Sequence, residues 1–220
     1  MSRSASLTPW SGQSPFATAF FSIYDWFALG LHCRFVWQCP SSHILDFYDH
    51  HVSGNHLDVG VGTGYFLDKC RFPIERPRLV LVDANSDILS RAKKRLKRYD
   101  PQIYRRDILE PLCIDTPGFD SVGLSLLLHC LPGSMNTKSM AFQNVMPLLN
   151  AGGVLFGATL LSEGVRSNPL STFTFWWANQ LGFMTTGQDS LEGLDRNLKK
   201  YFSGSHIELR GCAALFWARK

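Results

Sequence analysis

Three glycines, Gly60, Gly62 and Gly64, follow a short strand-like stretch that contains Asp58. The residues at 65–67 can start a helix. A strand, a glycine loop and a helix together bring bare backbone N–H groups close to a bound ligand. The spacing is Gly-x-Gly-x-Gly and differs from the Gly-x-Gly-x-x-Gly of dinucleotide enzymes, so it indicates a different adenosine-containing ligand. A tight turn that binds nothing is the alternative reading of the glycines.

Two further acids stand where strands are expected to end. Asp83 closes the apolar stretch 78–83, and Asp107, followed by Ile108, comes after a shorter stretch at 102–106. In an open α/β sheet the ligand binds outside the carboxyl ends of the strands. We therefore expect Asp83 to accept two ribose hydroxyls, and Asp107 with Ile108 to hold an exocyclic amine. Each acid can instead simply cap a helix that follows it.

A histidine, His129, follows the fourth expected strand, at 119–127. Its unperturbed pKa is near the working range of a general base, so it is the first candidate for a catalytic residue. A strand-end histidine bonded to the backbone is the competing interpretation. The neighbouring Cys130 is expected to pack in the core. Since the cysteines form no Cys-x-x-Cys pair, a zinc ribbon is unfavoured and no metal site is predicted.

Strand and helix patterns alternate through the central part of the chain, about 52–161. The expected strands are 56–60, 78–83, 102–106, 119–127 and 153–161. The expected helices are 64–71, a helix capped by Asn85 or Ser86, and 134–150, the last with Met140 facing inward. This alternation predicts an α/β fold with a mainly parallel sheet.

The flanking segments differ from this core in composition. We expect 1–15 to be mobile, 16–48 to form a cap of two helices, 162–203 to be a substrate-side insert, and 204–220 to close a single domain with an antiparallel hairpin. The second helix of the cap is expected to be capped by Ser41 or Ser42. Tyr24, Trp37 and Trp176 are candidate substrate-side residues, although aromatic residues at helical spacing more often lie in a core.

Composition excludes several classes of protein. The net charge is a mild +4, and much of the excess lies in the block 91–98, which is typical of the solvated face of a helix. Nucleic acid is therefore not an expected partner. No apolar run approaches the ~20 residues of a membrane helix, and no secretory signal is present at the start. The scattered cysteines are typical of free thiols in a reducing compartment, so a cytoplasmic location is expected.

The motifs resemble those of the class I S-adenosylmethionine-dependent methyltransferases. The resemblance rests on Asp58 with the three glycines, on Asp83 and on Asp107, and it covers about 43–161 and the closing strands at 205–219. More narrowly, the stretches 57–68, 128–132 and 152–157 are similar to small stand-alone methyltransferases of bacteria and filamentous fungi that are linked to secondary metabolism. Ala84 departs from that group, which more often has a larger apolar residue there.

The resemblance implies a Rossmann-like, seven-stranded sheet with an antiparallel last strand and helices on both faces. It places Asp58 and Gly60 against the methionine part of S-adenosylmethionine, Asp83 at the ribose, and Asp107 with Ile108 at the adenine. The predicted function is methyl transfer to a small, fairly apolar molecule. The first alternative is a protein of the same fold that binds the cofactor without transferring methyl. A nicotinamide dehydrogenase is a second alternative, and the glycine spacing argues against it.

Overall fold

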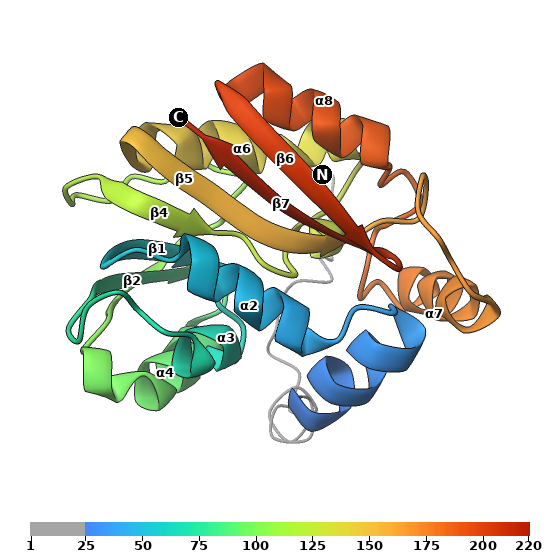
Figure 1. Cartoon of the computed structure of the whole chain (residues 1–220), viewed down its shortest axis with the longest axis horizontal. Coiled ribbons are helices and arrows are strands. Elements are labelled where there is room, and N and C mark those ends of the chain that lie inside the picture. The colour runs from blue at the N-terminus through green and yellow to red at the C-terminus, as the bar shows by residue number, and fades with distance from the viewer. Residues whose placement is uncertain (1–24) are drawn as a thin grey trace, which may run out of the picture.

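The computed structural model describes residues 25–220, so Tyr24 lies outside the described residues. Its centre is a seven-stranded sheet with the order β3-β2-β1-β4-β5-β7-β6 (Figure 1). The strands are β1 (Asn55–Val59), β2 (Arg78–Asp83), β3 (Gln102–Arg105), β4 (Phe119–Gly123), β5 (Leu149–Leu160), β6 (Gly204–Arg210) and β7 (Ala213–Arg219). The pairs among β1 to β5 are parallel, whereas β7 is antiparallel to both β5 and β6. The predicted Rossmann-like sheet with an antiparallel last strand is confirmed.

Helices cover both faces of the sheet, which explains the continuous apolar sequence of β2. Leu79 and Leu81 join the apolar cluster on one face, and Val80 and Val82 join the cluster on the other. The first face carries α2 (Ser41–His51), α3 (Tyr65–Lys69) and α4 (Ser86–Arg95), whereas η1 (Asp25–Val36) and α7 (Pro169–Gln180) pack on each other beyond the end of the sheet and join the same apolar cluster (Figure 1). The second face carries α5 (Met135–Lys138), α6 (Met140–Val145) and α8 (Leu191–Tyr201).

The helix expected at 134–150 is broken into shorter pieces. It consists of α5, α6 and the 3₁₀ turn η4 (Met146–Leu148), and β5 begins at Leu149, earlier than expected. Met140 was predicted to face inward, but its side chain is exposed where α6 begins. Gly152 lies inside β5 with φ of +74°, in the stretch where the pairing with β4 shifts register between Phe119 and Ser121. The expected fourth strand is also shorter. β4 ends at Gly123, although Leu124 and Leu126 still donate their N–H groups to the carbonyls of Phe156 and Ala158 in β5, and Leu126 has φ of +56°.

Helix starts were predicted with mixed success. Asn85 caps α4 as expected, since its side-chain oxygen accepts the N–H groups of Asp87 and Ile88. The predicted serine cap of α2 is wrong: Pro40 occupies the N-cap position and no side chain caps this helix. The fixed φ of a proline suits the entrance to a helix without any capping hydrogen bond.

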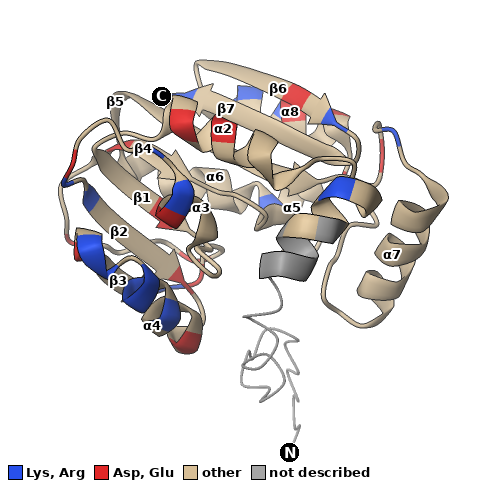
Figure 2. Cartoon of the chain, turned by 60° about the horizontal axis from the view of Figure 1, so that its bottom comes forward, with Lys and Arg blue, Asp and Glu red and all other residues tan. Residues whose placement is uncertain are grey.

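Charge is distributed unevenly over the molecule. Figure 2 shows the lysines and arginines of α4 on one side and an α7 that carries no charged residue. Along residues 25–220, no helix is long and apolar enough to cross a bilayer. The six cysteines all lie in this range and are free thiols, and Cys113 is the exposed one among them.

Candidate functional site

The glycine loop leaves the carboxyl end of β1 and is held against the neighbouring strand. Gly60 donates its N–H to the carbonyl of Val82 at 2.8 Å, and all three glycines have positive φ. A Cβ at Gly60 would meet the Leu127 side chain at 2.7 Å, so the loop has no room for a side chain there. Gly62 has open space out to 4.0 Å. The loop therefore presents bare backbone, as its sequence predicts.

Asp58, at the end of β1, is buried and hydrogen-bonded from two sides. The Tyr48 hydroxyl of α2 donates to its Oδ2 at 2.9 Å, and His56 Nε2 lies 3.4 Å from the same oxygen. A Cβ at Gly123 on the adjacent strand would lie 2.5 Å from Oδ2, so only glycine fits beside this carboxylate. The Tyr48 ring stacks on Phe66 of α3 at 5.4 Å between centroids. These contacts fix the orientation of the Asp58 side chain.

Asp83 ends β2 and is also buried. Burial raises the pKa of its carboxyl to about 6, against the stabilising N–H groups of Asn85 and Gly62. The hydrogen bond from Gly62 joins this acid directly to the glycine loop. A buried carboxylate with an elevated pKa beside a bare-backbone loop is typical of a ligand-binding site. Its place at the strand end agrees with the prediction, and its ribose contact stays a prediction.

Asp107 and Ile108 follow β3, and the structure separates their environments. Asp107 is exposed, and its Oδ1 accepts the N–H of Leu109 at 2.9 Å. Ile108 is buried, and its carbonyl accepts the side-chain amide of Asn144. The carboxylate of Asp107 thus already accepts a hydrogen bond within its own turn, and the helix cap of the competing interpretation is absent because no helix lies between β3 and β4. Its contact with a base stays a prediction.

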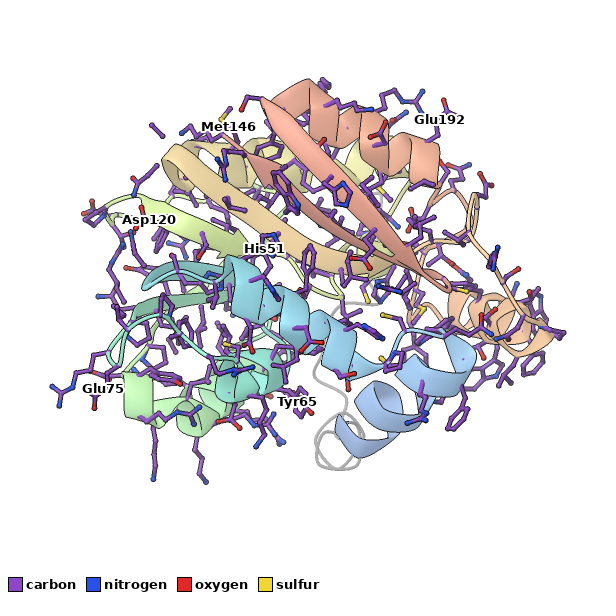
Figure 3. The ribbon with its side chains drawn as sticks, viewed as in Figure 1. His51, Tyr65, Glu75, Asp120, Met146 and Glu192 are labelled. Carbon is purple, nitrogen blue, oxygen red and sulfur yellow. The ribbon has the colours of Figure 1, made fainter. Side chains whose placement is uncertain are left out.

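A pocket opens beside the glycine loop, and Asp83, Asp107 and Ile108 are not among the residues that line it. It is lined by Tyr48, Asp58, Ser125, Leu126 and the glycine-loop and α3 residues 60–67. Figure 3 places Tyr65, which lines it, on the side of the sheet that carries α2 and α3, opposite Met146 and Glu192. Ser125 Oγ is buried near the Tyr48 hydroxyl. Its distances and angles to the described residues do not meet the criteria of a hydrogen bond. A buried hydroxyl in that state is suited to bond a ligand atom.

His129 lies on the 3₁₀ turn η3 (Leu128–Cys130) and does not line this pocket. Leu160 donates its N–H to His129 Nδ1 at 3.3 Å, so the proton of the neutral ring belongs on Nε2. Burial, aided by the charge of Lys138, lowers the pKa of His129 to about 3. The ring is therefore neutral near pH 7 and a weak base. These contacts agree with the structural interpretation of this histidine, and its role as a base stays a prediction.

The three candidate substrate-side residues have different surroundings. Tyr24 lies outside the described residues. Trp37 is buried and packs on Phe175 of α7 at 4.7 Å between ring centroids, so it belongs to the core as the alternative reading expects. Trp176 is 59% exposed on α7 and lies 6.0 Å from the Phe173 ring. Neither tryptophan lines the pocket.

The structure adds residues that sequence reasoning did not select. Tyr48 is one of them, since its hydroxyl donates a hydrogen bond to Asp58. Ser125 and Leu126 were read as part of a strand, whereas they form a wall of the pocket. The signal for Tyr48 is a tyrosine among the buried positions of α2, because a buried phenol normally has a hydrogen-bond partner.

Comparisons with known proteins agree with this geometry. A family model described as "Methyltransferase domain" matches residues 57–155. The chain is 36% identical over 207 residues to demethylluteothin O-methyltransferase of Streptomyces thioluteus, covering 94% of this chain and 90% of that protein. It is 34% identical over 200 residues to the physcion biosynthesis cluster O-methyltransferase of Aspergillus chevalieri, with 90% of each chain covered.

Solved structures show the same fold at low identity. The structure of DhpI in complex with S-adenosylhomocysteine has a TM-score of 0.64 at 14% identity, with 92% of this chain and 91% of that chain covered. The N-methyltransferase NodS of Bradyrhizobium japonicum WM9, with the same molecule bound, has a TM-score of 0.55 at 19% identity, with 98% and 93% covered.

The chain belongs to the class I S-adenosylmethionine-dependent methyltransferases. It is an enzyme, its cofactor is S-adenosylmethionine, and it carries out methyl transfer. The residues present fit that cofactor: the glycine loop has no side chain in the way, and the Ser125 hydroxyl is available in the wall. The alternative of a fold that binds the cofactor without transfer is not favoured by these relatives.

Proposed function

We propose that this methyltransferase acts on a hydroxyl group of a small, fairly apolar molecule, in secondary metabolism. The proposal rests on one observation, the cluster of apolar side chains that pocket residues share with α7. Val61, Leu67 and Leu126 of the pocket belong to the same apolar cluster as Phe175 of α7 and the nearby Trp37. Since α7 contains no charged residue, this side suits an apolar acceptor. Two relatives with O-methyltransferase names support an oxygen acceptor.

The proposed cofactor site uses the strand-end residues. Backbone of Gly60, Gly62 and Gly64 with Asp58 would hold the methionine part, Asp83 the ribose, and Asp107 with Ile108 the adenine. When bound, S-adenosylmethionine supplies a methyl group that is already activated on a sulfonium sulfur, so a strong catalytic motif is not required. The chain's own task is to orient the acceptor and exclude water.

The low basicity of the His129 ring favours an acceptor that loses its proton easily. With a pKa of about 3, this ring takes a proton from an alcohol poorly near neutral pH. A phenol or enol ionises far more readily than an aliphatic alcohol and needs less help from a base. We therefore propose a phenol-type hydroxyl as the acceptor. Trp176 and the exposed aromatic side chains of α7 are proposed to border its path into the site.

The test uses acceptors that share a ring system and differ in the reacting atom. Purified protein and isotopically methyl-labelled cofactor are incubated with 1-naphthol, 1-naphthylamine or 1-naphthalenemethanol, and the methylated product is identified by NMR. We expect the methyl ether of 1-naphthol, and loss of that product in Asp83→Ala. Transfer to the amine but not to the phenol would refute an oxygen acceptor, and preference for the benzylic alcohol would refute the phenol class.

We further propose a cytoplasmic enzyme organised as one domain, without a nucleic-acid or membrane partner. The six free thiols of the described chain support a reducing compartment. The positive charge of α4 and of the turn that follows it is partly neutralised, because Arg95 and Arg98 both lie within ion-pair distance of Asp68. Fluorescence microscopy of the tagged protein checks the location, and a punctate or membrane-bound signal would contradict it.

A further inference from the structure

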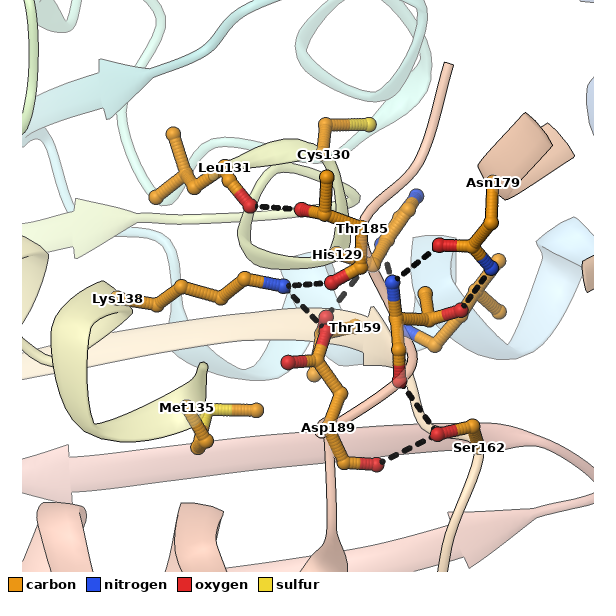
Figure 4. Close-up of polar contacts among 12 residues, drawn as sticks. His129, Cys130, Leu131, Met135, Lys138, Thr159, Ser162, Asn179, Thr185 and Asp189 are labelled. Atoms are coloured by element: carbon orange, nitrogen blue, oxygen red, sulfur yellow. Dashed lines mark hydrogen bonds and ion pairs between the residues drawn. The ribbon is translucent and has the colours of Figure 1, made fainter. Parts of the chain in front are cut away.

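A fully buried ion pair joins two distant parts of the chain. Lys138, at the end of α5, lies with its Nζ 2.6 Å from Oδ2 of Asp189, and neither side chain has exposed surface. Asp189 belongs to the connecting segment 181–190, which runs from α7 to α8. Figure 4 shows this pair among a group of polar contacts. The two residues are 51 positions apart, so the contact is made only by the fold.

A gain in folding stability is a weak explanation for a buried ion pair. Removing two charges from water costs several kcal/mol per ion, and apolar residues of similar volume are often as stable. Asp189 Oδ1 is in addition buried without a hydrogen-bond partner in the described chain, so the carboxylate is incompletely compensated. A pair that is costly to bury is better explained by the specific arrangement that it enforces.

The arrangement it enforces is the path of the connecting segment. Lys138 Nζ also donates to the carbonyl of Thr185 at 2.6 Å. Thr185 in turn donates its N–H to the carbonyl of His129 at 3.0 Å and its hydroxyl to the carbonyl of Leu131. The segment is thereby fixed on η3 at several points.

The same segment holds the C-terminal turn of α7. Thr186 donates its N–H to Oδ1 of Asn179 at 2.9 Å, and the Asn179 amide donates to the Thr186 hydroxyl at 2.9 Å. Ser162, just after β5, donates its hydroxyl to the carbonyl of Thr186 (Figure 4). α7 is therefore attached to the sheet through residues that Lys138 and Asp189 hold in place.

The pocket wall lies directly before η3. Ser125 and Leu126 line the pocket, and His129, which receives the N–H of Thr185, is three residues beyond Leu126. We propose that Lys138 and Asp189 form a positioning pair that fixes the connecting segment 181–190, and with it α7, relative to this wall. The pair thereby sets the acceptor side of the site, and this inference rests on the proposed function of α7.

The test removes both charges, because a single substitution would leave a lone buried charge and can unfold the chain. The variant is Lys138→Met with Asp189→Asn. The matched control is Lys199→Met with Asp195→Asn, a Lys–Asp pair with a Nζ–Oδ2 distance of 2.7 Å on the exposed face of α8. For each protein we would measure amide hydrogen exchange by mass spectrometry and the affinity for S-adenosylhomocysteine by calorimetry. We would also measure KM and kcat for the naphthalene acceptor that the wild type methylates.

For the buried pair we expect exchange over 169–190 to rise at least tenfold, with less than threefold change in β1 and β4 and in S-adenosylhomocysteine affinity. KM for the acceptor should rise about tenfold while kcat changes less than threefold. Unchanged exchange over 169–190, an equal rise throughout the domain, or an unchanged KM would each overturn the proposal. Failure of the proposed function is a separate result, because it is seen in the wild-type enzyme as methyl transfer to 1-naphthylamine and not to 1-naphthol. In that case 1-naphthylamine is the acceptor for which KM and kcat of the variants are measured.

Discussion

Substitution of Asp83 by asparagine separates the binding role of this acid from its effect on stability. The carboxyl of Asp83 has its pKa raised from 3.8 to about 6 by burial, so the folded state holds the proton more tightly than the unfolded chain. Ionisation at pH 7 then destabilises the fold by about 3 kcal/mol, and at pH 4 by about 0.6 kcal/mol. Because the folded pKa is raised, this destabilisation disappears as the pH falls through 6 towards 4.

Asparagine keeps the shape of the side chain and removes the charge. At pH 7 we expect Asp83→Asn to unfold at higher denaturant concentration than the wild type, with a gain of up to about 3 kcal/mol that falls below about 1 kcal/mol at pH 4. Asp115→Asn, an exposed carboxylate with the same change in net charge, is the control and should show neither effect. Urea unfolding at the two pH values measures both variants.

Cofactor binding should move in the opposite direction. Asparagine keeps one acceptor oxygen but removes the other and the negative charge, so two charge-assisted hydrogen bonds from the ribose hydroxyls become at most one neutral bond. S-adenosylhomocysteine binding should weaken by roughly 2–4 kcal/mol, about 30-fold to 1000-fold. In the wild type, affinity should fall about tenfold from pH 7 to pH 5 as Asp83 becomes protonated, and Asp83→Asn should lose this dependence. Calorimetric affinities that are flat across this pH range and agree within threefold between the two proteins would refute the assignment of Asp83.

Three further predictions concern the residues around the pocket. Tyr48→Phe removes the donor to Asp58 and should weaken S-adenosylhomocysteine binding roughly tenfold, with unchanged circular dichroism; an unchanged affinity would contradict it. Gly123→Ala should lower both Tm and affinity, because its Cβ would lie 2.5 Å from Asp58 Oδ2, whereas Gly187→Ala has no atom within 4 Å and serves as the control in thermal unfolding and calorimetry. The His129 ring should show constant NMR shifts from pH 5 to 8, since its pKa is about 3, and a midpoint near 6.5 would show this wrong.

Local sequence signals were sufficient for much of the fold. The continuous apolar run at 78–83 is β2, because a strand covered on both faces needs apolar residues at every position. The Asn85 cap could likewise be predicted from the sequence, since the capping side chain bonds to N–H groups only two and three residues further along the chain. The Gly-x-Gly-x-Gly spacing fixed the position of the loop, because positive φ at three residues restricts their type.

Contacts between distant residues could not be read in the same way. Nothing near Lys138 in the sequence indicates that its partner is Asp189, because this pairing depends on how η3, α5 and the segment after α7 come together. The break of the expected helix at 134–150 has a similar origin. Packing on the sheet places Leu149 in β5, and this tertiary contact outweighs the helical pattern before it.

The thiols have a consequence for an enzyme that handles an alkylating reagent. Burial raises the pKa of Cys33, Cys70 and Cys130 to about 12 and that of Cys39 to about 11. At pH 7, a thiol with a pKa of 12 is present as thiolate in about one molecule in 10⁵, and the thiolate is the nucleophilic form. These four sulfurs are therefore poor targets for a sulfonium methyl donor. The exposed Cys113 remains as the site for selective thiol labelling among the described residues.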